Sequence, residues 1–480
     1  MLLEPRTSPQ ISRRSLLAGT AVALASVAVV ACGSASPAPV ATTAPAAAPT
    51  KGAGAAPTAA PTVAAKPTTA AQPTAAASTS TGSLTISFWS SLMGSKEAAR
   101  AGLAKDFEAA NPGMKIQHEG FFDIMQNNEK LLTAMVAGNP PDVVSNHYYF
   151  VSNYANANAL VPLDPLMAQS KMADDLFVPS ILQLGQWKGK TYALPIYADT
   201  MAYFYNVDLY TKAGLDPEKP AATWNDMIAD AKKMTVRQGG KLVQEGMSVP
   251  QDASEDLSNM FYAMLLAGGG SFLSGDGKTA AFNDASGQQA LQTMVDLVHT
   301  DKVTDIGFGQ GLSGAATPFY DNKTGSRYDI PPTIFNISKY APKLNYAISP
   351  LPAGPKGQAT PVLAFEMFIP KGSKNQDNAW KFIAFAMTPP EQVKFNKTSN
   401  HLACEPEALQ SDPFFTTNKY VKPFYESLIG FSKPFPITPA YADVLATLQQ
   451  QLQAAVLAKS DVKTALDTAA SYANDQLSKV

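Results

Sequence analysis

The stretch KGKTYALPIYADTMAYFYNVDLY, from Lys188 to Tyr210, carries the clearest structural signal in this chain. From Tyr192 to Tyr205 it is almost wholly apolar and aromatic, which favours a buried strand. Asp199 is the one charged residue that interrupts this run. Three roles stay open for this acid at this point: a catalytic group, a ligand contact, or a core residue with fixed partners.

The first 31 residues resemble an export signal. Arg13 and Arg14 form a basic part, and the uncharged apolar run from Leu16 to Ala31 is shorter than the ~20 residues that a membrane span needs. The segment SRRSLL resembles a twin-arginine signal, although that pattern usually has Phe where Leu16 stands. We therefore predict a signal peptide over residues 1–31.

A lipid anchor and a linker are predicted to follow the signal. VVAC, which ends at Cys32, resembles a bacterial lipobox, so Cys32 is the expected lipidation site; the alternative is that Cys32 is only the last residue of a cleaved leader. Residues 32–82 are rich in Ala, Thr and Pro and bury too little apolar surface to fold. Because prolines keep such a segment extended, we predict a stalk that holds a folded body off a membrane.

The body, residues 83–480, is long enough for two lobes with separate cores. The formal net charge of the chain is −2 and its basic residues are scattered, which argues against a nucleic-acid partner. Cys404 is the only cysteine besides Cys32, so we expect neither an intramolecular disulfide nor a cysteine-rich metal site. No stretch after the signal predicts a transmembrane helix.

The body opens with a β-α-β-α-β pattern. Strands are predicted at 84–89, 114–120 and 142–144, and helices between them at 95–110 and 127–137. This order favours an α/β fold, with a mostly parallel sheet that helices cover.

Later segments of the body also carry helix signals. Thr223 is the expected N-cap of a helix that has Asp226 at its third position. Residues 307–346 are rich in Gly, Pro and Tyr and give no clear assignment. Four further amphipathic helices are predicted, at 286–298, 379–387, 441–457 and 462–477.

Motifs for catalysis and metal binding are largely missing. GLSGA, which contains Ser313, lacks the last glycine of a nucleophile elbow, and no histidine is evidently paired with it. The four histidines do not have metal-ligand spacing, so no cofactor is expected. Tyr148 and Tyr149 could ligate ferric iron as phenolates; the alternative is an aromatic loop that belongs to the core or stacks on a sugar.

Three predicted strand ends place aromatic residues beside polar ones, as a carbohydrate site requires. A sugar needs flat rings against its C–H faces, and carboxylates or amides for its hydroxyls. In α/β sheets such sites lie at the carboxyl ends of strands. The three groups are Trp89 with Ser90 and Ser91, Asn146 with Tyr148 and Tyr149, and Tyr197 with Asp199.

Across nearly the whole body the sequence resembles the extracellular solute-binding proteins of bacterial ABC importers, the group that includes maltose-binding protein. The most specific block is GKTYALPIYADTMAYFYNVDLYTKAGLDPEKPAATWNDM, which starts at Gly189. Further matching segments are FEAANPGMKI, PPDVV, LVPLDPL, PLPAGPKG, IPKGSKNQDNAWKFIAFAMTPPEQ and VKTALDTAASYANDQL. The resemblance is independent of the lipobox and the stalk, which agree with it.

The resemblance implies a two-lobe periplasmic-binding-protein-like fold of type II. Each lobe is expected to have a central, mostly parallel sheet with helices on its faces, and hinge strands to join the lobes. We expect chain crossings near Asp199, Ser313 and Met387. Lobe 1 would then hold residues 83–199 plus 313–388, and lobe 2 residues 200–312 plus 389–480.

The resemblance also implies ligand contacts from both lobes, in a cleft between them. The region of 313–345 departs from the family because AATPFY stands where many members have a Gly-x-Trp, which leaves the identity of the solute open. By position, the expected contacts are Trp89, Ser91, Asn146, Tyr148, Asp199, Gln251, Asp252, Phe319, Tyr320 and Tyr441.

These implications amount to a function as a lipid-anchored binding protein. It is expected to capture a mono- or oligosaccharide and deliver it to the transmembrane subunits of an ABC permease, as a monomer outside the cell membrane. A non-sugar solute, such as ferric iron, a polyamine or glycerol phosphate, is one alternative. A surface hydrolase is another; no activated nucleophile or metal supports it, although a pair of carboxylates across the cleft stays open.

Overall fold

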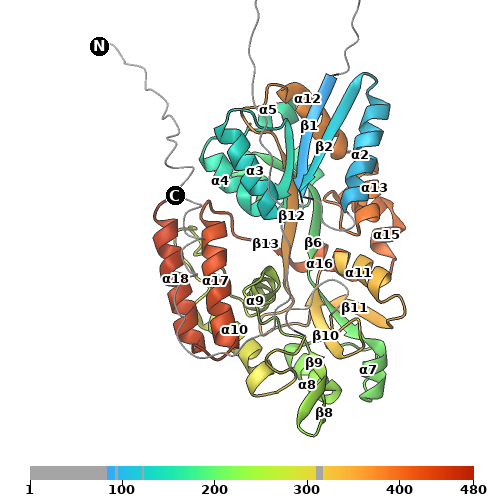
Figure 1. Ribbon diagram of the computed structural model, residues 1–480, viewed down its shortest axis with the longest axis vertical. Coiled ribbons are helices and arrows are strands. Elements are labelled where there is room, and N and C mark those ends of the chain that lie inside the picture. Colours follow the sequence, from blue (N-terminus) through green and yellow to red (C-terminus); the bar gives the residue numbers. More distant parts are fainter. Residues whose placement is uncertain (1–83, 92–95, 122–123, 310–316) are drawn as a thin grey trace, which may run out of the picture. The chain divides into compact units, whose positions relative to one another are not determined.

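The computed structural model describes residues 84–91, 96–121, 124–309 and 317–480, which form two large β-sheets with helices around each of them (Figure 1). A third, two-stranded sheet pairs β4 (Gln186–Trp187) with β5 (Lys190–Thr191). The predicted signal peptide, Cys32, the linker and Ser313 lie outside the described residues.

The first sheet confirms the β-α-β-α-β prediction. Strand β1 pairs in parallel with β2 and β3, while β12 runs antiparallel to β3 and β6 and parallel to β13. Every residue of β3, β6 and β12 is buried, as expected for strands whose two faces are covered. The strands are β1 (Leu84–Ser91), β2 (Met114–Phe121), β3 (Val143–His147), β6 (Ala193–Thr200), β12 (Thr360–Phe368) and β13 (Ser432–Pro434).

Helices cover both faces of the first sheet. Helix α2 packs against β2 and α13, and α3 contacts β1, β2 and β3 from the other side (Figure 1). Helix α16 contacts strands of both sheets. These helices are α2 (Lys96–Ala110), α3 (Ile124–Val136), α4 (Val151–Asn156), α5 (Asp164–Gln169), α6 (Pro179–Leu182), α12 (Gln376–Ala386), α13 (Pro389–Ser399), α14 (Pro406–Ser411), α15 (Pro413–Thr416) and α16 (Lys422–Phe431).

The second sheet has the strand order β11-β7-β10-β9-β8. Strand β10 is parallel to β9, and the other neighbouring strands are antiparallel. The prediction of a mostly parallel sheet in each lobe is therefore wrong for this sheet, because its pairings join segments far apart in the sequence, which local patterns do not reveal. Gly246 allows β9 to lie close to helix α8, because a Cβ atom there would come within 1.8 Å of the carbonyl oxygen of Ala231. The strands are β7 (Ala202–Asn206), β8 (Val236–Gln238), β9 (Lys241–Met247), β10 (Thr324–Asp329) and β11 (Tyr346–Pro350).

The helices near the second sheet include those that the sequence predicts with caps. Thr223 caps α8 in a reciprocal arrangement: its hydroxyl accepts from the Asp226 amide, and its own amide donates to the Asp226 carboxylate. Helices α17 and α18 pack against each other and against α10. The helices are α7 (Val207–Lys212), α8 (Trp224–Met234), α9 (Glu255–Ala267), α10 (Ala285–His299), α11 (Pro332–Tyr340), α17 (Tyr441–Val456) and α18 (Val462–Leu477).

Three segments carry the chain between the sheets. Strand β6 runs into β7 with Met201 alone between them, so the predicted crossing at Asp199 falls within one residue or two of the observed one. The chain returns to the first sheet between β11 and β12, and it leaves that sheet again between β13 and α17 (Figure 1). Short connections of this kind are typical of a hinge.

The strand pairing corrects part of the predicted lobe division. Residues 313–388 were assigned to lobe 1, but β10 and β11 both pair with β7 in the second sheet, and the chain rejoins the first sheet only at Thr360. Residues 389–480 were assigned to lobe 2, but α13 packs against α2 and β13 pairs with β12. Both ladders join residues far apart in sequence, which local patterns do not reveal. The limits 83–199 and 200–312 stay predictions.

Among the helices that the structure describes, none combines the length and the apolar character needed to cross a membrane.

Candidate ligand-binding site

The end of β1 places three of the predicted residues beside β3. Trp89 is half-buried and packs edge-on against Phe121, with ring centroids 5.2 Å apart. Ser90 is buried, and its hydroxyl lies 2.8 Å from Nε2 of His118. Ser91 is also buried, and its carbonyl oxygen accepts a hydrogen bond from Arg100. The Ser90 hydroxyl therefore has a protein partner, whereas the buried Ser91 hydroxyl has none among the described residues.

The end of β3 brings two independently predicted residues together. Tyr148 and Tyr441 come from segments almost 300 residues apart, yet their ring centroids lie 6.1 Å apart, and both rings pack against Phe435. Asn146 lies in β3, two residues before Tyr148 and opposite Glu366 of β12, and its side chain accepts from the His147 amide. All of these side chains are buried, so they form an aromatic layer next to the strand end.

The end of β6 holds Tyr197 and Asp199 against one histidine. His401 stacks on Tyr197, with centroids 4.0 Å apart, and its Nδ1 lies 2.7 Å from Oδ1 of Asp199. Burial lowers the pKa of His401 in spite of the neighbouring acid. The ring is therefore neutral, and because a carboxylate can only accept, Nδ1 carries the proton and donates it to Asp199.

A hydrogen bond joins this side of the protein to the second sheet's helices. The hydroxyl of Tyr149 donates to Oε1 of Glu255, the first residue of α9, at 3.3 Å. Burial raises the pKa of Glu255 and raises that of Tyr149 well above 10. The pKa of Tyr148 is raised in the same way.

Two cations outside the set of predicted contacts lie in the same region. Lys96 and Arg100 are on the buried face of α2, one helical turn apart. The Nζ atom of Lys96 lies 4.2 Å from the ring centroid of Phe365 and 4.8 Å from that of Tyr197. The spacing of α2 in the sequence could have indicated them, because two charged residues stand at core positions of this helix. Its buried stripe consists of Lys96, Ala99, Arg100, Leu103 and Phe107.

Other predicted contacts lie apart from this group. Asp252 is exposed and accepts from the Ser254 hydroxyl, and Gln251 is buried and bonds to the loop at Asp305 and Gly307. Phe319 is fully buried. Burial raises the pKa of Tyr320 to about 12. Within the described residues, no hydrogen bond or ring contact links these four to Asp199 or Tyr148, so their role as ligand contacts stays a prediction.

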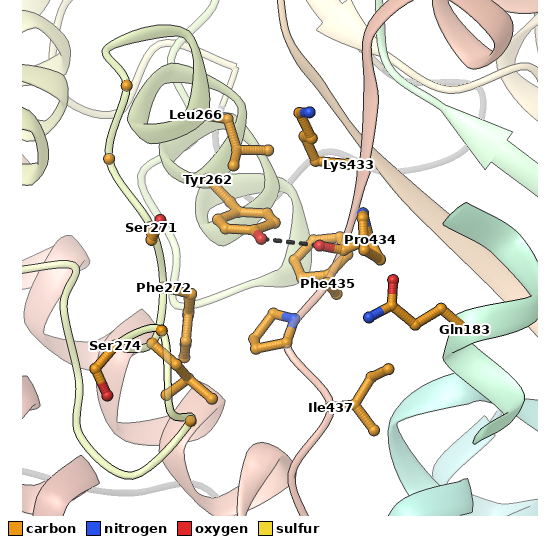
Figure 2. A pocket seen from close by; sticks show the side chains of 16 residues that line it. Gln183, Tyr262, Leu266, Ser271, Phe272, Ser274, Lys433, Pro434, Phe435 and Ile437 are labelled. Carbon is orange, nitrogen blue, oxygen red and sulfur yellow. Dashed lines mark hydrogen bonds between the residues drawn. The ribbon is translucent and has the colours of Figure 1, made fainter. Parts of the chain in front are cut away.

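A separate open pocket of about 610 Å³ lies where β13 leads into α17 (Figure 2). Its walls are the glycine-rich loop after α9, the segment from Lys433 to Ile437, and Gln183 from the other side. The hydroxyl of Tyr262 donates to the carbonyl oxygen of Pro434 across this wall, at 3.0 Å. None of the predicted contact residues lines this pocket, although Phe435 separates it from Tyr148 and Tyr441.

Among the described residues there is no group of three or more His, Cys, Asp or Glu side chains that could hold a metal ion. The model of the bacterial extracellular solute-binding protein family matches residues 90–393. The chain belongs to this family.

Two relatives show how far this solute-binding protein resembles other members. A protein of Brucella abortus (strain 2308), named as a candidate binding protein, is 26% identical over 381 residues, which cover 78% of this chain and 89% of the relative. The arabinooligosaccharide-binding protein of Bacillus subtilis (strain 168) is 26% identical over 317 residues, which cover 64% of this chain and 70% of the relative.

A solved structure confirms the fold of this solute-binding protein. The ABC transporter solute-binding protein of Thermotoga lettingae, bound to α-D-tagatose, matches with a TM-score of 0.72 at 22% identity, over 82% of this chain and 100% of the other. The prediction of a two-lobe binding-protein fold is therefore confirmed, and the family consists of binding proteins rather than enzymes.

Proposed function

We propose that this solute-binding protein captures a carbohydrate between its two sheets and delivers it to an ABC permease. The observation that carries the proposal is the meeting of two sides: strand ends with aromatic and hydrogen-bonding groups on one, and the start of α9 on the other, joined by Tyr149 and Glu255. A sugar needs this combination of flat rings and polar groups.

Names of similar proteins support a carbohydrate as the solute. The relative from Bacillus subtilis is named for an arabinooligosaccharide, and the structure from Thermotoga lettingae holds a sugar. The direct contacts we propose are those predicted from the sequence, with Trp89, Tyr148 and Tyr441 as aromatic surfaces and Asp199 as an acceptor for hydroxyl groups. A ligand that contacts both lobes would bind the closed form more tightly and shift the protein toward it.

Anchoring and the lack of catalysis are part of the same proposal. Lipidation of Cys32 would attach the protein outside the cell membrane, with residues 33–82 as a stalk, and the folded body would act as a monomer. No turnover is expected, because the described residues offer hydrogen bonds to Asp199 and Glu255 but no activated nucleophile.

A thermal-shift screen tests the proposed function. The purified full chain is heated with a panel of neutral and acidic mono- and oligosaccharides, and with ferric citrate and spermidine as non-sugar probes. A sugar present at 100 times its Kd should stabilise the protein by ~2.7 kcal/mol, which gives a clear rise in Tm. A rise with iron or spermidine and with no sugar of the panel contradicts the proposal.

A further inference from the structure

Lys96 and Arg100 are two cations in a place where cations are normally paired. Their side chains belong to residues that are 8% and 1% exposed. Burying a charge is costly unless a counter-charge or a full set of hydrogen bonds compensates for it. The hydrogen bonds and counter-charges around these two residues therefore show which interactions the protein itself does not supply.

The protein supplies few partners to either cation. Arg100 donates from Nη1 to the carbonyl oxygen of Ser91 at 2.5 Å and interacts electrostatically with Tyr197. Within the part of the chain that the structure describes, its Nε and Nη2 atoms are buried and have no hydrogen-bond partner. Lys96 places its Nζ against the rings of Phe365 and Tyr197. Among the described residues, no carboxylate oxygen lies within 4.0 Å of either cation.

The two carboxylates whose charges act on Lys96 already accept hydrogen bonds from other residues. Asp199 and Glu255 both act on Lys96 electrostatically, so the formal charges of the group balance. However, Asp199 accepts from His401 and Glu255 accepts from Tyr149, and neither forms an ion pair with a cation. Arg100 thus keeps unused donors, whereas Asp199 and Glu255 each already accept a hydrogen bond.

The histidines around the two cations do not add positive charge. Burial and the charge of Arg100 lower the pKa of His118 to about 4. Burial and Lys96 lower the pKa of His147, and both cations contribute to the lowered pKa of His401. All three rings are neutral near pH 7, so an anion at this place would be held by Lys96 and Arg100 themselves.

We propose that the solute carries a carboxylate or phosphate group that binds Lys96 and Arg100, and that the protein therefore takes up an acidic carbohydrate. This inference rests on the proposed function, since it places the solute in the same region. The planar guanidinium can donate two parallel hydrogen bonds to either group, and Lys96, the first residue of α2, supplies a point charge.

Paired ligands separate this inference from the proposed function. Isothermal titration of the full chain at pH 6.5 and low salt compares D-glucuronate with D-glucose, D-galacturonate with D-galactose, and D-glucose 6-phosphate with D-glucose. The disaccharides digalacturonate and galactobiose extend the panel. We expect at least one acid to bind 10-fold or more tightly than its neutral counterpart, and the arm that responds identifies a carboxylate or a phosphate.

Two other outcomes have different meanings. Neutral sugars that bind as tightly as the acids, or more tightly, would overturn the inference and leave the proposed function intact. An absence of binding by every sugar, neutral or acidic, would count against both.

Variants of the two cations test their direct role. Lys96→Met keeps the length of the side chain and removes its charge, so the acid should bind at least 10-fold more weakly while the neutral counterpart changes by less than twofold. Arg100→Lys keeps the charge and loses the paired donors, and it should act in the same direction. The matched control is Lys105→Met, an exposed position on the same helix, which should change neither.

The pH dependence of ligand affinity gives a second test, because a purely structural role of Lys96 would not produce it. The pKa of Lys96 is lowered to about 7, first by burial and then by Arg100. Its positive charge is therefore lost as the pH rises through 7, and affinity for the acid should fall between pH 6.5 and 8.5. This decline should be absent in Lys96→Met; an unchanged decline in that variant, or equal losses for acid and neutral ligands, would contradict the role of Lys96.

Discussion

His401 donates its Nδ1 proton to Asp199 across 2.7 Å, although the two residues are 202 positions apart. The contact is reinforced by the backbone, because Ala198 and Leu402 exchange hydrogen bonds with each other in both directions. The end of strand β6, which leads into the crossing, is thereby held against the loop after α13. This gives Asp199 the fixed partner that a core acid needs, and it leaves the proposed contact with a sugar hydroxyl as a prediction.

Asp199→Asn should weaken binding of the carbohydrate without unfolding the protein. The amide oxygen can still accept from His401, but a hydrogen bond to a charged group contributes about 1.5–3 kcal/mol, so Kd should rise by ~10-fold or more. Titration calorimetry measures Kd, and thermal melting should show Tm within ~2 °C of the parent protein. Asp216→Asn, an exposed residue paired with Lys219, is the control. A large loss of Tm at unchanged affinity would assign Asp199 to the core alone.

Tyr149→Phe should reduce closure of the two lobes. It removes the hydroxyl that reaches Glu255 and preserves the buried ring. A hydrogen bond of ~1 kcal/mol corresponds to ~5-fold in the closed-to-open ratio, so affinity should fall by a similar factor. Small-angle X-ray scattering with saturating and limiting ligand follows the closed fraction, and Tyr472→Phe in α18 serves as the control. The same affinity and scattering in variant and parent would show that this contact does not bias closure.

Glu245→Gln should make stability less dependent on pH. Burial raises the pKa of Glu245 from 4.5 to about 7, while the hydroxyls of Thr304 and Thr324 oppose the shift. Since the folded-state pKa is the higher one, this residue's stabilising effect is present below pH 4.5 and is lost as the pH rises through 7.

The size of the Glu245 effect follows from the same shift. Between pH 4 and 8, the free energy of unfolding of Glu245→Gln relative to the parent should increase by ~3 kcal/mol. Urea denaturation at pH 4, 6 and 8 measures it. Glu129→Gln, an exposed glutamate in α3, should show no such trend. A constant difference between Glu245→Gln and the parent across this range would mean that Glu245 is not held protonated.

Thr223→Ala should destabilise the fold locally and leave ligand binding alone. It removes the hydroxyl that accepts from the Asp226 amide at 3.2 Å and donates to its carboxylate at 2.7 Å. Loss of an N-cap costs about 1 kcal/mol, which urea denaturation can resolve. Thr223→Ser retains the cap and should behave like the parent. A change in sugar affinity in the alanine variant would show that α8 is coupled to the site.

Cys32→Ser should release the protein from the membrane. Lipidation needs the thiol of Cys32, so the variant should lose incorporation of a labelled fatty acid and move from the membrane fraction to the soluble fraction of cell extracts. Cys404→Ser is the matched control, because this cysteine is the other one in the chain and is buried in the fold. Retention of the label in Cys32→Ser would refute the predicted anchor.

Several elements could be predicted from the sequence because their signals are local. The alternating apolar residues of β1, the cap of α8 and the stripes of α17 and α18 depend on neighbours within a few residues, and the structure has each of them. The unassigned stretch of 307–346 contains β10 and α11. Strand β10 carries charged residues, such as Arg327 and Asp329, that pair with each other across one position and hide the strand pattern.

The candidate site could be predicted only in part. Residues at strand ends were found because an aromatic next to a polar group is visible in the sequence, and Tyr148 and Tyr441 indeed meet. The sequence did not indicate His401, Glu255 or the two buried cations, because the role of each depends on contacts with residues of another helix or strand.

The sequence by itself determined the α/β character, the first crossing and the family of this protein, since these depend on local periodicity and on blocks of contiguous residues. Tertiary structure decided which sheet β10 and β11 join, which histidine holds Asp199, and that Lys96 and Arg100 lie buried with no described carboxylate oxygen within 4.0 Å. The physical reason is that strand pairing and burial bring together residues as much as 200 positions apart, and the cost of an unpaired charge arises only once folding has removed it from water.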